Sequence, residues 1–150
     1  TETTIYSYSV PGGTLSTNVM LRLTLWGEFT NNGSGATRTF TIRVKYGATT
    51  ALVLVASVTD TTNVRPFKIV AELSGRDATT VQAAVGLLCV GDGVAANDAA
   101  DQPLALPRMS IYRTVAIDSS VAQTLAVTAE ASVSTNLTET NLRVAQLEEI

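Results

Sequence analysis

The chain has 150 residues, of which 45% are hydrophobic and 15% charged, and its formal net charge at pH 7 is −3. This composition predicts one folded domain, because disordered chains contain fewer apolar residues and more charge. The negative charge argues against nucleic-acid binding, and no apolar run approaches the ~20 residues of a membrane-spanning helix. The absence of histidine excludes Ser-His-Asp and Cys-His catalysis and the usual zinc sites.

The first third of the chain alternates apolar and polar residues, as half-buried β-strands do. A short β-prone run, Ile5–Val10, ends at Pro11-Gly12-Gly13. Residues 19–29 and 38–46 each carry apolar side chains at every second position, with an Asn- and Gly-rich run between them. We therefore predict that these two segments pair as an antiparallel β-hairpin over a core.

Two later segments lack a polar face. Residues 51–56 are apolar at every position, and in residues 79–90 both alternating sets are mainly apolar. We predict that Ala84, Gly86, Leu88 and Val90 lie opposite the core-facing set, which holds Val85, Leu87 and a buried Cys89. A strand that is apolar on both sides is covered either by the second sheet and a loop or by another subunit. Exposed together, the extra apolar faces of the two segments would form a sticky patch, which favours burial against another subunit.

The remaining strands follow in order. Pro66 suits the first position or the edge of a strand that continues to Gly75. Gly91–Pro107 has no strand period and is the one long connection. Residues 108–118 and 123–133 alternate again, and the last strand starts at Asn141 with a predicted bulge near Ala145-Gln146.

These segments amount to nine candidate strands in a single domain spanning residues 1–150. The predicted fold class is all-β, an antiparallel two-sheet β-sandwich of jelly-roll topology with eight to nine strands. The immunoglobulin spacing of two cysteines around a tryptophan is absent, since Cys89 is the sole cysteine. The predicted core residues are Leu21, Leu23, Leu25, Phe40, Ile42, Val44, Ile69, Val127 and Ala129.

Acidic residues offer two chemical alternatives. Glu28, Glu72 and Glu130 could act as a glycosidase pair, but each is the polar member of an alternating strand, which favours a solvated outer face. The second alternative is a Ca²⁺ site in the long connection. An ordinary polar loop is favoured over it, because the spacing of the carboxylates lacks the regular EF-hand steps. We predict no catalytic residue, no cofactor and no required metal. The loop carboxylates and amide are Asp92, Asn97, Asp98 and Asp101.

Trp26 lies out of phase with the core residues of its strand, so we predict that it points to the outer face. Such a ring can stack on a sugar, fill a pocket of a neighbouring subunit or lie over its own sheet.

Five segments resemble a β-sandwich module that recurs in virion proteins of tailed bacteriophages. They are Ser9–Leu15, Leu21–Gly27, Arg43–Thr50, Thr124–Ala129 and Leu142–Glu148. The likeness spans nearly the whole chain and consists of strand and turn patterns rather than catalytic motifs. In phages such modules serve as capsid decoration proteins, head fibres and trimeric tips of tail fibres or baseplates.

The resemblance implies a trimeric, non-enzymatic virion component. A one-domain chain without a shaft favours direct attachment to the major capsid protein, on the capsid surface, after synthesis in the bacterial host cytoplasm. The alternative is a receptor- or carbohydrate-binding module of a tail fibre, tail spike or baseplate, with a host surface glycan as ligand. Nucleic acid and membrane are not expected partners. The predicted subunit or capsid interface consists of Trp26, Val53, Val55, Ala84, Leu88, Val90 and Tyr112.

Overall fold

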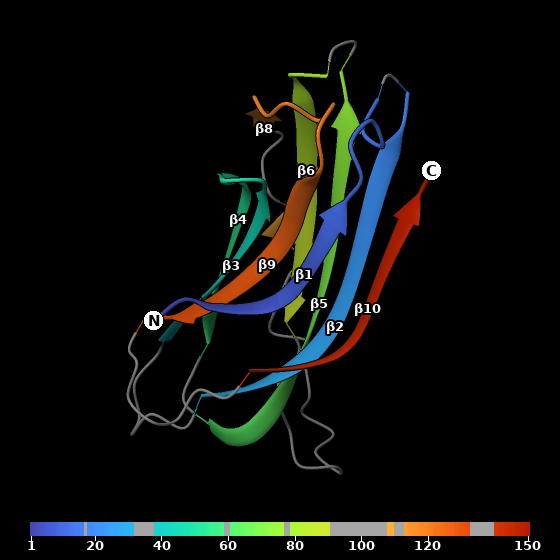
Figure 1. Cartoon of the computed structure of the whole chain (residues 1–150). Helices are drawn as coiled ribbons and strands as arrows, with labels where there is room; N and C mark the ends of the chain where they lie inside the picture. The colour runs from blue at the N-terminus through green and yellow to red at the C-terminus, as the bar shows by residue number, and fades with distance from the viewer. Residues whose placement is uncertain are drawn as a thin grey trace.

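The protein is built from two antiparallel β-sheets that pack face to face (Figure 1). The computed structural model describes residues 1–16, 18–31, 38–58, 61–76, 79–90, 108–109, 113–132 and 140–150. Within these ranges no residue is helical, so none lies in a helix long and apolar enough to cross a membrane. The predicted all-β, two-sheet antiparallel sandwich is confirmed.

The two sheets differ in size. The small sheet has the order β1 (Thr3–Val10), β9 (Gln123–Ala131), β3 (Arg38–Tyr46) and β4 (Thr49–Val58). The large sheet has the order β10 (Thr140–Glu149), β2 (Met20–Asn31), β5 (Thr61–Gly75) and β6 (Gln82–Val90). Two short strands, β7 (Arg108–Met109) and β8 (Arg113–Val115), pair with β6. Both lie in the segment 108–118, which was predicted as one strand.

The chain changes sheet repeatedly. The steps from β1 to β2, β2 to β3, β4 to β5, β8 to β9 and β9 to β10 each connect strands of different sheets. Repeated crossing of this kind is shared by β-sandwiches with Greek-key connections. The pairs β3–β4 and β5–β6 are instead neighbours within one sheet. Figure 1 shows the two sheets that this crossing produces, with β1 and β10 on the same side of the molecule although they belong to different sheets.

The predicted hairpin of residues 19–29 with residues 38–46 is wrong. Its two strands, β2 and β3, lie in opposite sheets, where β2 pairs with β5 and β10, and β3 pairs with β4 and β9. Their apolar faces do meet, but across the core rather than side by side. The rings of Phe29 and Phe40 stack with centroids 4.4 Å apart and an interplanar angle of 10°. Alternation shows that a strand buries one face but not whether its neighbour is paired or stacked.

The core fills the space between the sheets. Phe67 of β5 joins the aromatic stack, 6.3 Å from Phe29 and 5.7 Å from Phe40 between ring centroids. Aromatic contacts of this type stabilise a fold by about 0.5–1.5 kcal/mol beyond the contribution of the apolar area that they bury. All nine predicted core residues are buried: Leu21, Leu23, Leu25, Phe40, Ile42, Val44, Ile69, Val127 and Ala129.

The assignment of faces on β6 is also wrong. Ala84 and Leu88 are only 1% exposed and face the core, opposite Leu73 and Ile69 of β5. Gly86 lies between them, and a Cβ there would come within 2.7 Å of Leu52 from the small sheet. The glycine therefore permits close approach of the two sheets. The outer set of β6, which includes Val85, Leu87 and Cys89, is half-buried.

Two local features also differ from expectation. The irregularity in β10 lies between Leu142 and Val144, not near Ala145-Gln146. Pro66 lies inside β5 rather than at its start, opposite Glu28 of β2. The ladder between β5 and β6 begins one residue later, at Phe67, so a proline at this position is compatible with a long strand.

Truncation of Leu23 tests the core directly. The Leu23→Ala variant should lose about 2–5 kcal/mol of unfolding free energy, because the fully buried side chain would leave a cavity between the sheets. Urea denaturation measures this loss. Val144→Ala is the matched control, since Val144 is 54% exposed and its truncation should change stability by less than about 0.5 kcal/mol. Equal stability of the two variants would contradict the assignment of faces.

Candidate interaction surfaces

Two of the buried polar residues in the described structure hydrogen-bond to backbone carbonyls near turns. Gln82 and Ser119 are both 0% exposed. The Gln82 side-chain amide donates to the carbonyls of Thr79 and Ile117, each at 2.8 Å. The Ser119 hydroxyl lies 2.8 Å from the carbonyl of Leu15 and 2.9 Å from that of Thr79. These side chains are satisfied by backbone groups, which indicates a structural role.

The three glutamates considered as catalytic candidates lie far apart on outer faces. Each forms an ion pair with an arginine of the neighbouring strand, as the alternation predicted for solvated positions. Cross-strand pairs of opposite charge stabilise a sheet by about 0.2–1 kcal/mol each. The pairs are Glu28–Arg143 at 2.7 Å, Glu72–Arg22 at 2.8 Å and Glu130–Arg43 at 2.7 Å.

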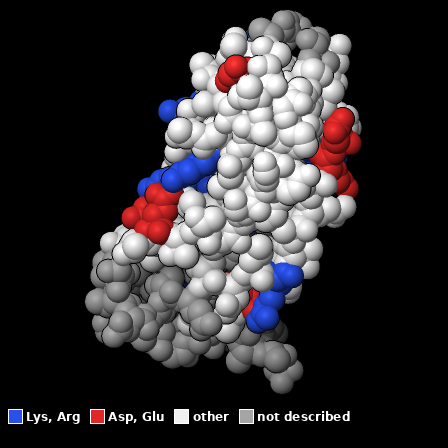
Figure 2. Space-filling view, viewed as in Figure 1, with Lys and Arg blue, Asp and Glu red and all other residues white. Residues whose placement is uncertain are grey.

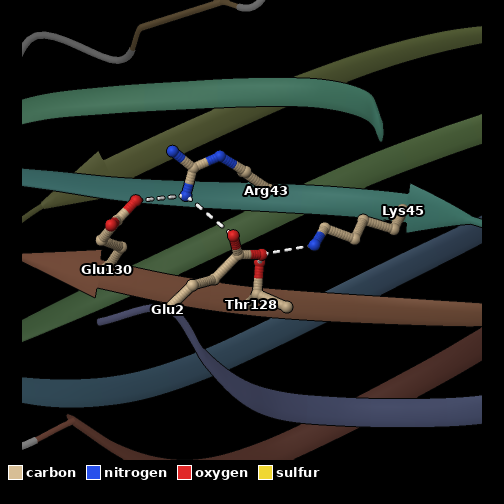
Figure 3. Close-up of polar contacts among 5 residues, drawn as sticks. All are labelled: Glu2, Arg43, Lys45, Thr128 and Glu130. Atoms are coloured by element: carbon tan, nitrogen blue, oxygen red, sulfur yellow. Dashed lines mark hydrogen bonds and ion pairs between the residues drawn. The ribbon is translucent and has the colours of Figure 1, made fainter. Parts of the chain in front are cut away.

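A charged network covers part of the small sheet (Figure 3). Glu2 lies just before β1, and its carboxylate approaches the Lys45 ammonium at 2.5 Å and Arg43 at 3.5 Å. The hydroxyl of Thr128, a residue only 5% exposed, donates to the same carboxylate at 2.5 Å. Arg43 also binds Glu130, so the network joins β3, β9 and the start of the chain. It fixes residues 1–3 against the outer face of the sheet.

These contacts change the acidity of Glu2. The Lys45 ammonium and then the Thr128 hydroxyl bind the ionised carboxylate, and together they hold the pKa of Glu2 below its ordinary value. A lowered pKa means that the carboxylate stabilises the folded state above its unfolded-state pKa. This contribution is lost as the pH falls through the lowered, folded-state pKa.

Replacement of Glu2 should therefore have a pH-dependent effect. The Glu2→Gln variant should melt below the wild type at pH 7, and the difference should shrink as the pH falls through the lowered pKa of Glu2. Thermal melts followed by circular dichroism across this range provide the measurement. Lys68→Gln, which removes an exposed charge from β5, is the control. A constant difference at every pH would show that Glu2 does not act through its charge.

An apolar surface lies beside this network. Val53 and Val55 of β4 are 42% and 39% exposed, whereas the inward residues Leu52, Leu54 and Ala56 of the strand are buried. The two valines stand opposite Arg43 and Thr41 of β3 on the outer face of the small sheet. Because β4 is the edge strand, they form an apolar stripe at one border of that face. The β4 stripe, Val53 and Val55, retains its predicted accessibility to a partner.

A second apolar surface lies on the large sheet. Trp26 is 40% exposed and points outward as predicted. It stands between Val144 of β10, which is 54% exposed, and Lys68 of β5. The Glu28–Arg143 ion pair adjoins it on the same face. The Trp26 surface, defined by Trp26, Val144 and Lys68, thus combines an accessible aromatic ring with polar groups at its border.

The other predicted interface residues are either buried or outside the described residues. Ala84 and Leu88 are 1% exposed and Val90 is 6% exposed, so their assignment to an accessible interface is wrong. Their face of β6 is apolar because it contacts the small sheet. Tyr112 lies outside the described residues, as do Asp92, Asn97, Asp98 and Asp101. The Ca²⁺ alternative for Gly91–Pro107 therefore stays untested.

Sequence reasoning missed the Glu2 network and the exposure of Val144. Glu2 and Thr128 are 126 positions apart in the chain, and only the pairing of β1 with β9 brings them together. A bulge at Arg143 re-aims the side chains of β10, and alternation does not locate bulges. The signals for a charged outer face were Arg43 and Lys45 at alternate positions of β3 and Glu130 at a polar position of β9.

The described residues contain no group of three or more His, Cys, Asp or Glu side chains placed to hold a metal ion. No family model, curated protein or solved structure matches the chain significantly.

Proposed function

We propose that this protein is a non-enzymatic structural component of a tailed-bacteriophage virion. It decorates the capsid surface as a homotrimer, binds the major capsid protein and stabilises the assembled shell. The proposal rests on the resemblance of its strand and turn segments to the phage β-sandwich module. Within the structure, the β4 stripe is the observation that carries it.

The β4 stripe favours assembly for a physical reason. Outward positions of a solvated strand are usually polar, yet β4 places two valines there, each about two-fifths exposed. Small apolar side chains on an edge strand let another subunit approach closely. In a closed symmetric oligomer every subunit buries its stripe, so no stripe remains exposed to solvent. The Glu2 network borders the stripe and supplies charged groups for the rim of the contact. The threefold order comes from the resemblance.

Light scattering on the purified protein tests the assembly. The mass at micromolar concentration should be three times the chain mass of 15.7 kDa, or a multiple of that trimer. The double variant Val53→Asp/Val55→Asp should reduce this mass threefold, because ionised carboxylates resist burial at the contact. Val121→Asp is the matched control, since Val121 is a 54% exposed valine in a turn. A wild-type mass that is no multiple of three would contradict the trimer.

Attachment to a capsid is a separate prediction. Phage particles that carry the protein should resist heating better than particles without it, because a ligand that binds only the assembled shell stabilises that shell. Release of DNA on heating, followed with an intercalating dye, measures the difference. Re-addition of purified protein to bare particles should restore the resistance. Equal heat resistance with and without the protein would contradict the capsid attachment and favour the tail-appendage alternative.

The Trp26 surface favours the second candidate, recognition of a host surface glycan by a tail-appendage module. An exposed indole can stack on the apolar face of a sugar ring, while Lys68, Glu28 and Arg143 supply hydrogen-bonding groups nearby. On this reading Trp26→Ala should abolish binding on a glycan array. Tyr8→Ala, which removes a 46% exposed aromatic residue from β1, should leave it intact. Absence of binding by the wild type would remove this candidate.

A further inference from the structure

The strand β10 forms an open edge of the large sheet. Its one hydrogen-bonded neighbour among the described strands is β2, and eight consecutive residues, Arg143–Ile150, include only one that is not exposed. Figure 1 shows β10 along the right flank of the molecule, with no other strand beyond it. An edge strand presents outward N–H and C=O groups that can pair with a further strand.

The core side of this edge is incompletely covered. Ala145 and Leu147 pair with Leu25 and Leu23, which are buried, so their side chains share the inner face. Ala145 is nevertheless exposed, and Leu147 only partly buried. Tyr8 of β1 is paired with the buried Leu125 and also lies on the inner face, yet it is 46% exposed. Inward-facing apolar side chains therefore remain open to solvent where the two sheets end.

The charges along β10 are separated. Arg143 lies near the start of the strand, and Glu148 and Glu149 lie at its end, with uncharged residues between them. Figure 2 shows acidic and basic groups at opposite ends of the same flank. A twofold axis through the middle of such a strand would bring the basic end of one copy beside the acidic end of another.

We propose that the β10 edge binds the β10 edge of a second copy of this chain. From Val144 to Glu149 the register with β2 is uninterrupted, so this is the regular part of the edge. Antiparallel pairing centred on Gln146 places Gln146 opposite its own copy and Ala145 opposite Leu147 of the second copy. It brings Arg143, which lies on the outer face in an ion pair with Glu28, alongside the outward-facing Glu148 of the second copy at both ends. Directly opposite residues in an antiparallel pair share a face, and this register keeps the inner set inside.

The pairing accounts for the uncovered residues. The axis is perpendicular to the sheet, so the small sheets of both copies lie on the same side of one continuous large sheet. The gap between them would be filled by Tyr8, Ala145 and Leu147 from both copies, which excludes water from their apolar surfaces. Such a contact repeats the same patch on both partners, as twofold interfaces require. It is distinct from the β4 stripe, which lies in the other sheet.

Charge exchange tests the proposal. The variants Arg143→Glu and Glu148→Lys should each lose the contact, because like charges would then face each other on the outer face. Mixed in equal amounts, the two should associate, since every charged end meets its opposite. Light scattering follows the masses, with Lys68→Glu as a control that makes the same charge change away from the edge. Circular dichroism verifies that each variant is folded.

The wild-type mass should be an even multiple of 15.7 kDa, halved in each variant and restored in the mixture. A wild-type mass of two chains that falls to one chain in the variants would support the β10 contact and contradict the trimer. A wild-type mass of six chains that falls to three would support both. A wild-type mass that the charge variants leave unchanged, or a mixture that does not reassociate, would overturn the β10 contact. A mass of three chains insensitive to these changes would overturn it and leave the proposed trimer standing.

Discussion

The face-to-face packing of two sheets is the constraint on which the rest of this structure depends. Phe29 and Phe40 stack across the core from strands that follow one another in the chain, and Phe67 leans against both. Around them the inward residues of β2, β3, β5, β6 and β9 interlock, helped by Gly86, which leaves room for Leu52. Because the inner faces are used in this way, the outer faces and the sheet edges remain for function.

The outer faces and sheet edges carry ion pairs and a few exposed apolar surfaces. Ion pairs between neighbouring strands occupy many outward positions and hold the protein's own charges in place. Between and beside them lie the apolar exceptions, which are the β4 stripe, the Trp26 surface and the uncovered inner side of β10. A charged outer face keeps a β-sandwich soluble, and a small number of apolar exceptions can direct it to specific partners. This distribution supports the proposal that the protein assembles with partners.

The sequence predicted the fold class and most of the core, because alternation is a local property. Leu21, Leu23 and Leu25 repeat with period two, and any sandwich must bury them. Alternation failed where both faces of a strand are apolar, as with Ala84 and Leu88. It also failed for the partnership of β2 with β3, since strands stacked in opposite sheets show the same pattern as a hairpin.

The candidate surfaces were only partly predictable for a related reason. Trp26, Val53 and Val55 stand out within their own strands and were found. The Glu2 network depends on contacts between residues far apart in the chain, which no single segment reveals. The open edge of β10 is a property of strand order, and strand order is decided by the pairing of whole strands.

Hydrogen–deuterium exchange, compared at high and low protein concentration, tests most directly the claim that this protein works through contacts with copies of itself. Backbone exchange in the edge strands β4 and β10 should be slower at high concentration. Exchange in β5, which is paired on both sides within the chain, should not depend on concentration. Exchange rates that are equal at both concentrations in all three strands would contradict the account.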